Sequence, residues 1–233
     1  MPASPETRAV LLDLDGTLLD TAPDLAGAVN ALRGEHGLSP LPITDLRPLC
    51  SWGARGMLRG GMDIEPGHPD YETLRDRFVS LYRSRLTEAT QPFPGMREAL
   101  AALAADGWAW GVVTNKFESL AVPLMEAMVF EPPPVCVIGG DSAAHPKPHP
   151  APLLLACERG GVAPADCVYV GDSARDIAAG RAAGMRTVAA AYGYIEADDA
   201  AETWGADVLI HDAAELAMAI AEAAGLGPVT ADR

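Results

Sequence analysis

The stretch from Arg8 to Asp20, RAVLLDLDGTLLD, limits the fold of this chain more than any other. Its apolar run, residues 9–12, does not alternate with polar residues, which is typical of a strand buried on both faces of a parallel sheet covered by helices. Asp13 then lies at the carboxyl end of that strand, where open α/β sheets bind ligands. The stretch predicts a strand that carries an acid to a binding edge.

A second acid, Asp15, follows Asp13 at a spacing of two. Side chains at this spacing on an extended segment point the same way, so the two carboxylates repel each other unless a cation lies between them. The simplest such cation is Mg²⁺. The alternative is an ordinary strand-end Asp followed by a turn Asp before Gly16, and the stretch alone does not decide between the two.

Length and charge narrow the class of protein. The 233 residues suffice for one large domain or two smaller ones, and 49% hydrophobic with 21% charged residues is typical of a soluble globular enzyme. The formal charge of −15 argues against nucleic acid and anionic membrane surfaces as partners. An anionic substrate would need local positive charge.

The cysteines and the N-terminus indicate the compartment. Cys50, Cys136, Cys157 and Cys167 show neither CxxC nor zinc-site spacing, which predicts reduced, mostly buried thiols. The opening MPASPETR lacks an apolar signal region, and no run approaches the roughly 18–20 apolar residues of a membrane span. We therefore expect a cytoplasmic protein.

Residues 20–90 have a helical character. The segment from Thr21 to Asp24 has the form of a capping box, and apolar residues at helical spacing follow it as far as Gly34. Residues 37–67 are rich in Gly and Pro, which predicts short helices and loops at best. The apolar stripe of residues 71–86 predicts an amphipathic helix.

From Gly95 onward, short apolar strands alternate with helices, which is typical of βαβ units. Strands are expected at 108–114, 135–140, 167–172, 186–192 and 206–210, with helices between them, a last helix at 211–224 and a frayed tail from Gly227. The first strand lies before residue 20, so the helical stretch is an insertion. We expect a Rossmann-like parallel sheet core, residues 1–17 and 92–233, with an inserted α-helical cap domain, residues 18–91, over the sheet edge.

Three further polar groups lie where a predicted strand gives way to the next segment. They could meet Asp13 and Asp15 at one edge of the sheet. They are Thr114-Asn115-Lys116, Lys147 between two prolines, and Gly171-Asp172-Ser173-Ala-Arg-Asp176.

Each of these groups also has an ordinary structural explanation. Asn115 with Glu118 could cap a helix, and Ser173 with Asp176 forms a capping-box pattern. Lys147 could be a surface lysine. The order of these groups along the chain decides between the structural and the functional explanation.

That order, DLDGT, a strand ending in Thr-Asn, Lys-Pro and then GDS with a further Asp, resembles the four motifs of the haloacid dehalogenase superfamily over nearly the whole chain. The insertion resembles its C1 cap. The stretches LDLDGTLLDTAPDL, VVTNK, PKPHPAPLLLA and VGDSARDIAAGRAAGM are most similar to those of phosphoglycolate phosphatases. The chain departs from that pattern at Leu12, at Phe117 and at His145-Pro146.

The resemblance implies roles for the residues. Asp13 is the nucleophile that forms an aspartyl phosphate, the Asp15 carboxyl is the general acid and base, and Lys147 neutralises charge. Thr114 and the Asn115 backbone bind phosphate oxygens.

The resemblance also implies a cofactor and a place for substrate. Mg²⁺ is held by Asp13, the backbone carbonyl of Asp15 and Asp172, with support from Asp176. In the insertion, Arg55 of SWGARGM is the candidate for a substrate carboxylate, although a solvated loop arginine is the more ordinary explanation.

The expected function is that of a Mg²⁺-dependent phosphomonoester hydrolase acting on a small phosphorylated metabolite, with 2-phosphoglycolate favoured. WGVVTNK, RAAGMRT, YGYI and WGAD also resemble N-acetylmuramic acid 6-phosphate phosphatases. A phosphomutase shares the core residues. A receiver-type phospho-Asp module lacks the inserted cap, and a dehalogenase would leave Asp15 and the metal acids without a use. The sequence leaves monomer and homodimer open.

Overall fold

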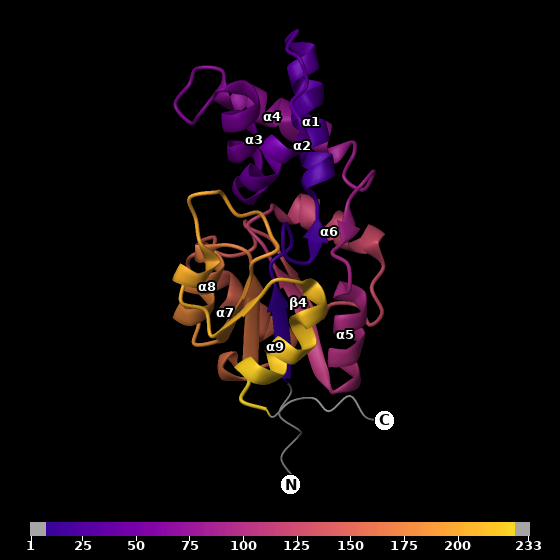
Figure 1. Cartoon of the computed structure of the whole chain (residues 1–233), viewed down its shortest axis with the longest axis vertical. Coiled ribbons are helices and arrows are strands. Elements are labelled where there is room, and N and C mark those ends of the chain that lie inside the picture. Colours follow the sequence, from indigo (N-terminus) through magenta and orange to yellow (C-terminus); the bar gives the residue numbers. More distant parts are fainter. Residues whose placement is uncertain (1–7, 227–233) are drawn as a thin grey trace.

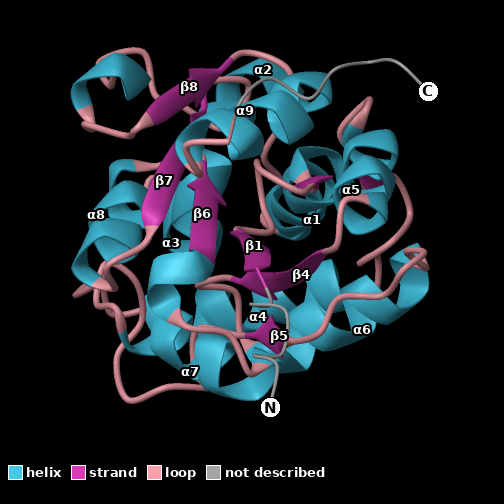
Figure 2. Cartoon of the chain, turned by 90° about the horizontal axis from the view of Figure 1, so that it is seen from below, coloured by secondary structure: helices cyan, strands magenta, loops and turns pink. Residues whose placement is uncertain are grey.

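The computed structural model describes residues 8–226, and its centre is a six-stranded parallel sheet (Figures 1 and 2). The strand order is β5-β4-β1-β6-β7-β8, so the first strand of the chain lies in the middle. The strands are β1 Arg8–Leu12, β4 Trp108–Val113, β5 Val137–Ile138, β6 Cys167–Gly171, β7 Arg186–Ala190 and β8 Val208–Ile210. The predicted parallel α/β fold is confirmed.

Helices cover both faces of this sheet (Figure 2). Successive residues of β1 explain why: Val10 and Leu12 pack in one apolar cluster, with α5, α6 and α9, whereas Ala9 and Leu11 pack in another, with α7 and α8. The unbroken apolar run therefore does signal burial on two faces. The helices are α5 Met96–Ala105, α6 Glu118–Met128, α7 Ala151–Gly160, α8 Ala174–Ala182 and α9 Leu216–Ala223.

The register of the central strands brings three polar segments to one edge. Leu12 of β1 pairs with Val112 of β4 and with Val170 of β6. Asp13 follows the first strand directly, while Thr114 and Asp172 each lie two residues beyond the paired positions. All three therefore lie beside one another at the carboxyl edge.

A second group of helices lies beyond this edge, at the top of Figure 1. We call it the helical layer: α1 Ala22–Glu35, α2 Ile43–Leu46, η1 Arg47–Trp52, α3 Gly53–Met62 and α4 Tyr71–Arg83. Its apolar side chains, among them Val29, Leu46 and Phe78, form a further cluster, which also includes Leu120 of α6 and Tyr194. The chain enters and leaves it through a short antiparallel ribbon of β2, Leu19–Asp20, and β3, Gln91–Pro92.

The start of α1 differs from the prediction, because Thr21 and Asp24 form no capping box. The Thr21 hydroxyl instead donates to the Asp15 carboxylate at 2.6 Å. The Asp24 carboxylate accepts hydrogen bonds from the backbone of Ala89 and from the Thr90 backbone and hydroxyl. Tertiary partners have replaced the local ones.

The glycine-rich segment at 53–62 is expected to hold at best short helices and loops, and it forms the ten-residue helix α3. A Cβ atom at Gly56 would collide with the backbone oxygen of Leu49, and one at Gly61 would collide with the Val29 side chain. The glycines therefore permit close packing of this helix within the layer, at a cost in helix propensity.

Smaller differences lie near the C-terminus. The strand expected at 135–140 is only two residues long, and the last helix begins at Leu216 after a short turn of 3₁₀ helix, η4 Ala213–Glu215. Two further short 3₁₀ turns are η2 Pro164–Asp166 and η3 Ala201–Thr203. The predicted fraying from Gly227 lies outside the described residues.

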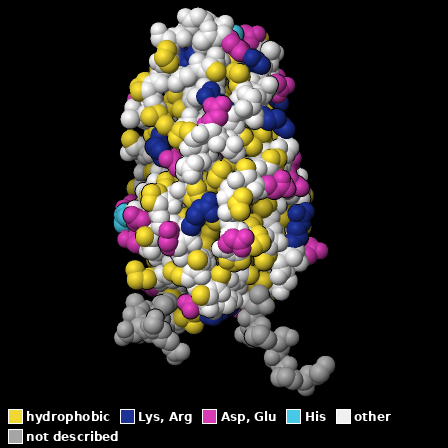
Figure 3. All heavy atoms as spheres, turned by 90° about the vertical axis from the view of Figure 1, so that its right-hand side faces the viewer, with side chains coloured by type: hydrophobic (Ala, Val, Ile, Leu, Met, Phe, Trp, Pro, Cys, Tyr) yellow, Lys and Arg dark blue, Asp and Glu magenta, His cyan; other side chains and the backbone are white. Residues whose placement is uncertain are grey.

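The side chains of the described residues confirm the expectation of buried, reduced cysteines. The four cysteines are all buried and unbonded. No helix within residues 8–226 is long and apolar enough to cross a membrane. On the face drawn in Figure 3, basic side chains stand among acidic and apolar ones.

Candidate active site

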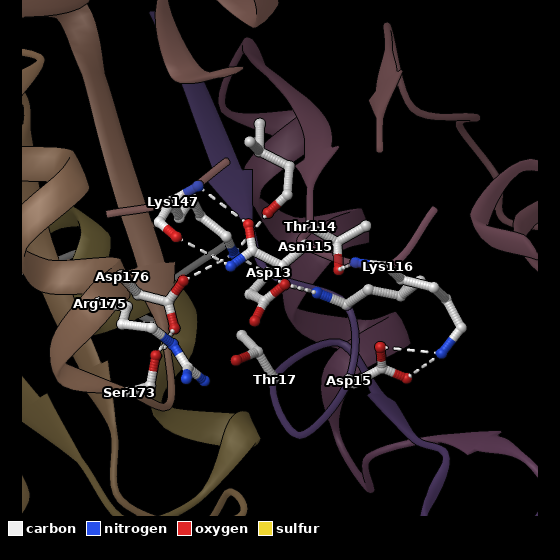
Figure 4. Close-up of polar contacts among 12 residues, drawn as sticks. Asp13, Asp15, Thr17, Thr114, Asn115, Lys116, Lys147, Ser173, Arg175 and Asp176 are labelled. Atoms are coloured by element: carbon white, nitrogen blue, oxygen red, sulfur yellow. Dashed lines mark hydrogen bonds and ion pairs between the residues drawn. The ribbon is translucent and has the colours of Figure 1, made fainter. Parts of the chain in front are cut away.

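A cavity of about 300 Å³ lies between the carboxyl edge of the sheet and the helical layer. Its floor contains side chains from segments far apart in the sequence, and Figure 4 shows most of them converging. The predicted residues that line it are Asp13, Asp15, Arg55, Thr114, Asn115, Lys147 and Asp176. The structure thus brings the sequence motifs into one site.

Asp13 follows β1 at the floor of the cavity, with a side chain only 14% exposed. Its Oδ1 accepts a hydrogen bond from the backbone N–H of Leu14 at 2.7 Å and lies 2.9 Å from the Lys147 ammonium. Burial raises the pKa of Asp13 to about 6, Lys147 opposes that shift, and the nearby Asp176 and Asp15 add to it.

Lys147 is a buried cation with four oxygen partners. Its Nζ lies 2.7 Å from Asp176, 2.7 Å from the Tyr169 hydroxyl and 2.9 Å from the Val113 carbonyl, in addition to Asp13. Burial disfavours its charge, but Asp13 and Asp176 outweigh this and raise the pKa of Lys147 above the ordinary lysine value. The interpretation of Lys147 as a surface lysine is wrong.

The loop of Lys147 is fixed by Asn115. The Asn115 amide donates to the Lys147 carbonyl at 3.0 Å, and its oxygen accepts from the Lys147 backbone N–H at 2.9 Å. Asn115 is therefore not the cap of α6, which follows Phe117. The side chain of Thr114 is buried, and its hydroxyl accepts from the Lys116 backbone N–H at 3.2 Å. One polar turn after β4 thus positions the lysine.

Asp176 serves two purposes at the start of α8. It forms the predicted capping box with Ser173, whose N–H and hydroxyl donate to its Oδ2. Its other oxygen faces Lys147. The capping and functional explanations therefore both apply to this residue.

Asp172, Asp13 and Asp176 offer carboxylate oxygens that lie within 4.8 Å of one another. Asp172 accepts hydrogen bonds from the Thr17 hydroxyl and from the backbone N–H of Tyr194. Burial, followed by the charges of Asp13 and Asp176, raises the pKa of Asp172 well above its usual range. The Lys147 ammonium contacts only Asp13 and Asp176 of these three acids. The cluster is therefore an all-oxygen donor set with excess negative charge, which fits a hard divalent cation.

The turn that follows Asp13 needs glycine at position 16. Gly16 has a φ of +85°, and a Cβ atom there would collide with the Asp172 carboxylate. The DLDGT turn can therefore approach Asp172 only without a side chain at this position.

Asp15 lies apart from this cluster, as Figure 4 shows. Both of its oxygens contact the Lys116 ammonium, at 2.7 and 2.9 Å, and one accepts from Thr21. Lys116 is almost fully buried. Burial acts to lower the pKa of its ammonium, but the Asp15 carboxylate outweighs burial, so the pKa lies above the ordinary lysine value. The two neighbouring aspartates therefore have different partners.

Arg55 lies in the first turn of α3, not in a loop, and its exposed side chain lines the cavity. Within residues 8–226 it pairs with no carboxylate. Sequence reasoning missed Arg175, which also lines the cavity, donates to Ser51 and lies 4.1 Å from the ring centre of Trp52. Its position in the first turn of α8, between Ser173 and Asp176, was the available signal.

Tyr194, in the YGYI segment, was another residue without an assigned role. Its N–H donates to Asp172, and its hydroxyl donates to Asp20 at 2.8 Å and accepts from the Ala22 N–H. Glu196, two residues on, accepts from Trp52 and pairs with Arg59 of the helical layer. This loop therefore contacts the acid cluster, the ribbon and the layer.

Residues 10–190 match the family model of haloacid dehalogenase-like hydrolases. The chain belongs to this family. The match starts in β1 and ends with β7, so it includes every predicted site residue and the helical layer. The predicted family and its enzymatic nature are confirmed.

Two curated relatives carry different names. A phosphoglycolate phosphatase of Xanthomonas campestris is 45% identical over 212 residues, covering 90% of this chain and 94% of the relative. An N-acetylmuramic acid 6-phosphate phosphatase of Pseudomonas aeruginosa is 40% identical over 209 residues, covering 90% and 92%.

Among solved structures, a predicted phosphoglycolate phosphatase of Haemophilus somnus has a TM-score of 0.77 and 26% identity, covering 92% of this chain and 98% of that one.

Proposed function

We propose that this chain is a Mg²⁺-dependent phosphomonoester hydrolase in which Asp13 is the nucleophile. The observation that carries the proposal is the contact of Asp13 with the buried Lys147 at the floor of a cavity beside two further acids. We also propose that the helical layer belongs to a C1-type cap domain, residues 18–91, as its place over the cavity supports.

In the proposed reaction, a carboxylate oxygen of Asp13 attacks phosphorus, and the bond between phosphorus and the ester oxygen breaks. Water then hydrolyses the aspartyl phosphate and releases inorganic phosphate. Lys147 neutralises charge between Asp13 and the phosphoryl group, while Thr114 and the Asn115 backbone bind phosphoryl oxygens. The Asp15 carboxyl protonates the leaving oxygen and later takes a proton from water.

Asp13, Asp172 and the Asp15 backbone carbonyl would hold the Mg²⁺ ion, with Asp176 in support. The bound ion would supply positive charge that lets an anionic nucleophile approach an anionic ester. The crowding of the three acids and their oxygen-only chemistry support this assignment.

The names of the relatives supply two candidate substrates. We propose 2-phosphoglycolate first, because the sequence motifs favour it, and N-acetylmuramic acid 6-phosphate second. Both carry a carboxylate, for which Arg55 and Arg175 are the available cations in the cavity. A cytoplasmic enzyme, either a monomer or a homodimer, remains the expectation.

The Asp13→Asn variant tests the proposal. We expect phosphate release from p-nitrophenyl phosphate with Mg²⁺ to fall by roughly 10⁴-fold or more, because an amide oxygen is a poor nucleophile. The circular dichroism spectrum should stay that of the wild type. Substantial turnover by a folded Asp13→Asn protein would refute the nucleophile assignment.

A further inference from the structure

Lysine occurs only twice in this chain, and both lysines contact the DLDGT turn. Of the 17 lysine and arginine residues, all except Lys116 and Lys147 are arginine. Lys147 contacts Asp13, Lys116 contacts Asp15, and both lysine side chains are at most 6% exposed. Lysine carries a compact charge on a flexible stem, whereas arginine carries a wide planar group. The compact cation is therefore found only beside these two acids, and the proposed function gives a task to Lys147 alone.

The turn after β4 determines where the Lys116 side chain begins. The Lys116 N–H donates to the Thr114 hydroxyl at 3.2 Å, and the Lys116 carbonyl accepts from the Gly140 N–H at 2.8 Å. Asn115, within the same turn, is hydrogen-bonded to the backbone of Lys147. One turn thus fixes the origin of both buried ammonium groups.

The Asp15 carboxylate lies beside Lys116 and away from Asp13, as Figure 4 shows. Lys116 Nζ is 2.7 Å from one Asp15 oxygen and 2.9 Å from the other. The Thr21 hydroxyl donates to the first of these oxygens, and the ring centre of Tyr82 lies 4.7 Å from the ammonium. Within residues 8–226, Lys116 pairs with no second carboxylate, so this buried cation has Asp15 alone as its counter-charge.

Lys147 has no such capacity to spare, because it already pairs with both Asp13 and Asp176. With Lys116 removed, Asp15 would be the acid of the turn that lacks an ammonium. A carboxylate in that condition moves toward solvent or toward the remaining positive charge of the cavity. Either movement takes the Asp15 carboxyl from its place, and a movement toward Lys147 would make it compete with Asp13.

We infer that Lys116 is a positioning residue that holds the Asp15 carboxyl apart from the ion pairs of Lys147. The inference rests on the proposed function, in which Asp15 protonates the leaving oxygen and later takes a proton from water. Lys116 acts through Asp15, so its contribution exists only while residue 15 is an acid, and only in steps that need the proton of that acid. The two lysines thus divide the two acids of one turn, with Lys147 for the nucleophile and Lys116 for the proton carrier.

A double-mutant cycle on kcat/KM for phenyl phosphate tests this dependence. Lys116→Met should lower kcat/KM by about tenfold, which is part of what a well-placed general acid contributes. In the Asp15→Asn background the same substitution should change kcat/KM by less than about twofold, because no acid is left to position. An equal loss in the two backgrounds would overturn the inference. Lys116→Gln, which keeps a hydrogen-bond donor for Asp15, takes the place of Lys116→Met in the cycle if the latter does not fold.

The leaving group provides a second readout that a merely structural role would not change. Nitrophenolate leaves readily as an anion, whereas the departure of phenol gains more from a proton. Lys116→Met should therefore lower kcat/KM for p-nitrophenyl phosphate by less than about threefold, against about tenfold for phenyl phosphate. Equal losses on the two esters would overturn the inference.

Arg77→Met is the matched control for both assays. It also replaces a cation by methionine, but it breaks an exposed pair with Glu35 within the helical layer, and Arg77 does not line the cavity. Both kcat/KM values should stay at the wild-type level. A preferential loss on phenyl phosphate in this variant would show that the leaving-group effect is not specific to Lys116 and would overturn the inference.

The scarcity of lysine makes the contact itself observable by NMR. A sample with isotope-labelled lysine contains two side-chain ammonium groups, and the Lys116 variant assigns their signals by removing one. The Lys116 signal should shift in Asp15→Asn and keep its wild-type position in Arg77→Met. An unchanged Lys116 signal in Asp15→Asn would contradict the contact on which the inference depends.

Failure of the underlying function looks different. If Asp13→Asn hydrolyses both aryl phosphates as fast as the wild type, the proposed reaction is refuted. If Asp15→Asn is as active as the wild type, the role of Asp15 and this inference are both refuted. If both aspartates are required but Lys116→Met has the same effect in both backgrounds and on both esters, only the inference is refuted.

Discussion

The cavity is lined on one side by the carboxyl edge of the sheet and on the other by the helical layer. The two sides differ in how far the protein itself provides partners for their polar groups. At the sheet edge, Lys147 has four oxygen partners. Asp172 accepts a hydrogen bond from the Tyr194 N–H, and Asp176 accepts one from the Ser173 N–H. On the helical side, the exposed Arg55 lines the cavity and pairs with no carboxylate within the described chain. The edge is organised before any ligand binds, which is what electrostatic catalysis requires.

Removal of Lys147 should produce the largest effect, because the edge works as one unit. Lys147→Met leaves Asp13 and Asp176 without their buried cation, so we expect the free energy of unfolding to fall by about 3–5 kcal/mol, together with loss of turnover. Urea denaturation at neutral pH measures this. Arg186→Met, which breaks an exposed pair with Asp207, is the control and should change stability by less than about 1 kcal/mol. An equal loss of unfolding free energy in the two variants would contradict the prediction that the buried edge depends on its ion pairs more than the surface does.

Metal removal tests the same edge without altering a side chain. Treatment with EDTA should lower turnover by roughly 10³-fold, since a bound cation contributes several kcal/mol to transition-state stabilisation. Added Mg²⁺ should restore it. Calorimetric titration of Mg²⁺ should show weaker binding to Asp172→Asn than to the wild type. Full activity in metal-free protein would contradict the assignment of the acid cluster.

Asp15 tests the comparison between the sheet edge and the helical layer, because it lines the same cavity but is paired with Lys116 rather than Lys147. Proton donation by Asp15 requires its carboxyl to leave the two contacts with the Lys116 ammonium. Asp15→Asn should lower turnover by about 10²-fold or more, and phosphoenzyme should accumulate in acid-quenched samples. An undiminished rate would remove Asp15 as the acid and base.

The smallest effect is expected where the helical layer meets the loop after β7. Glu196→Gln weakens a partly exposed pair with Arg59, whose side chain is 38% exposed, so stability should fall by less than about 1 kcal/mol. A thermal melt measures this change. A loss of several kcal/mol would mean that the layer depends on this loop as strongly as the edge depends on Lys147.

The residues at the sheet edge could be predicted from sequence because their chemistry and their strand-end positions are both visible there. Asp13, Thr114, Lys147 and Asp176 all line the cavity at this edge. Asp172 lies beside them, with a carboxylate oxygen within 4.8 Å of those of Asp13 and Asp176. Residue type, spacing and order along the chain suffice for such a site.

The helical layer could not be predicted in the same way. From the sequence, the Thr21 hydroxyl could cap its own helix. Only the fold shows that it donates instead to Asp15, six residues earlier in the chain. Helix α3 contains four glycines, and nothing local reveals that Gly56 and Gly61 are packing positions. The proximity of Arg175 to Trp52 likewise depends on the docking of two distant segments. Tertiary contacts decide each of these cases.

The ribbon of β2 and β3 has an evolutionary consequence. Leu19 pairs with Pro92 and Asp20 with Gln91, so the chain leaves the sheet and returns to it at neighbouring points. An insertion with adjacent ends can diverge, or be exchanged between homologues, without shifting the register of any central strand. Such a graft would transfer α1 to α4 while the acids at the edge stay in place. Lineages can therefore acquire new substrates at unchanged chemistry.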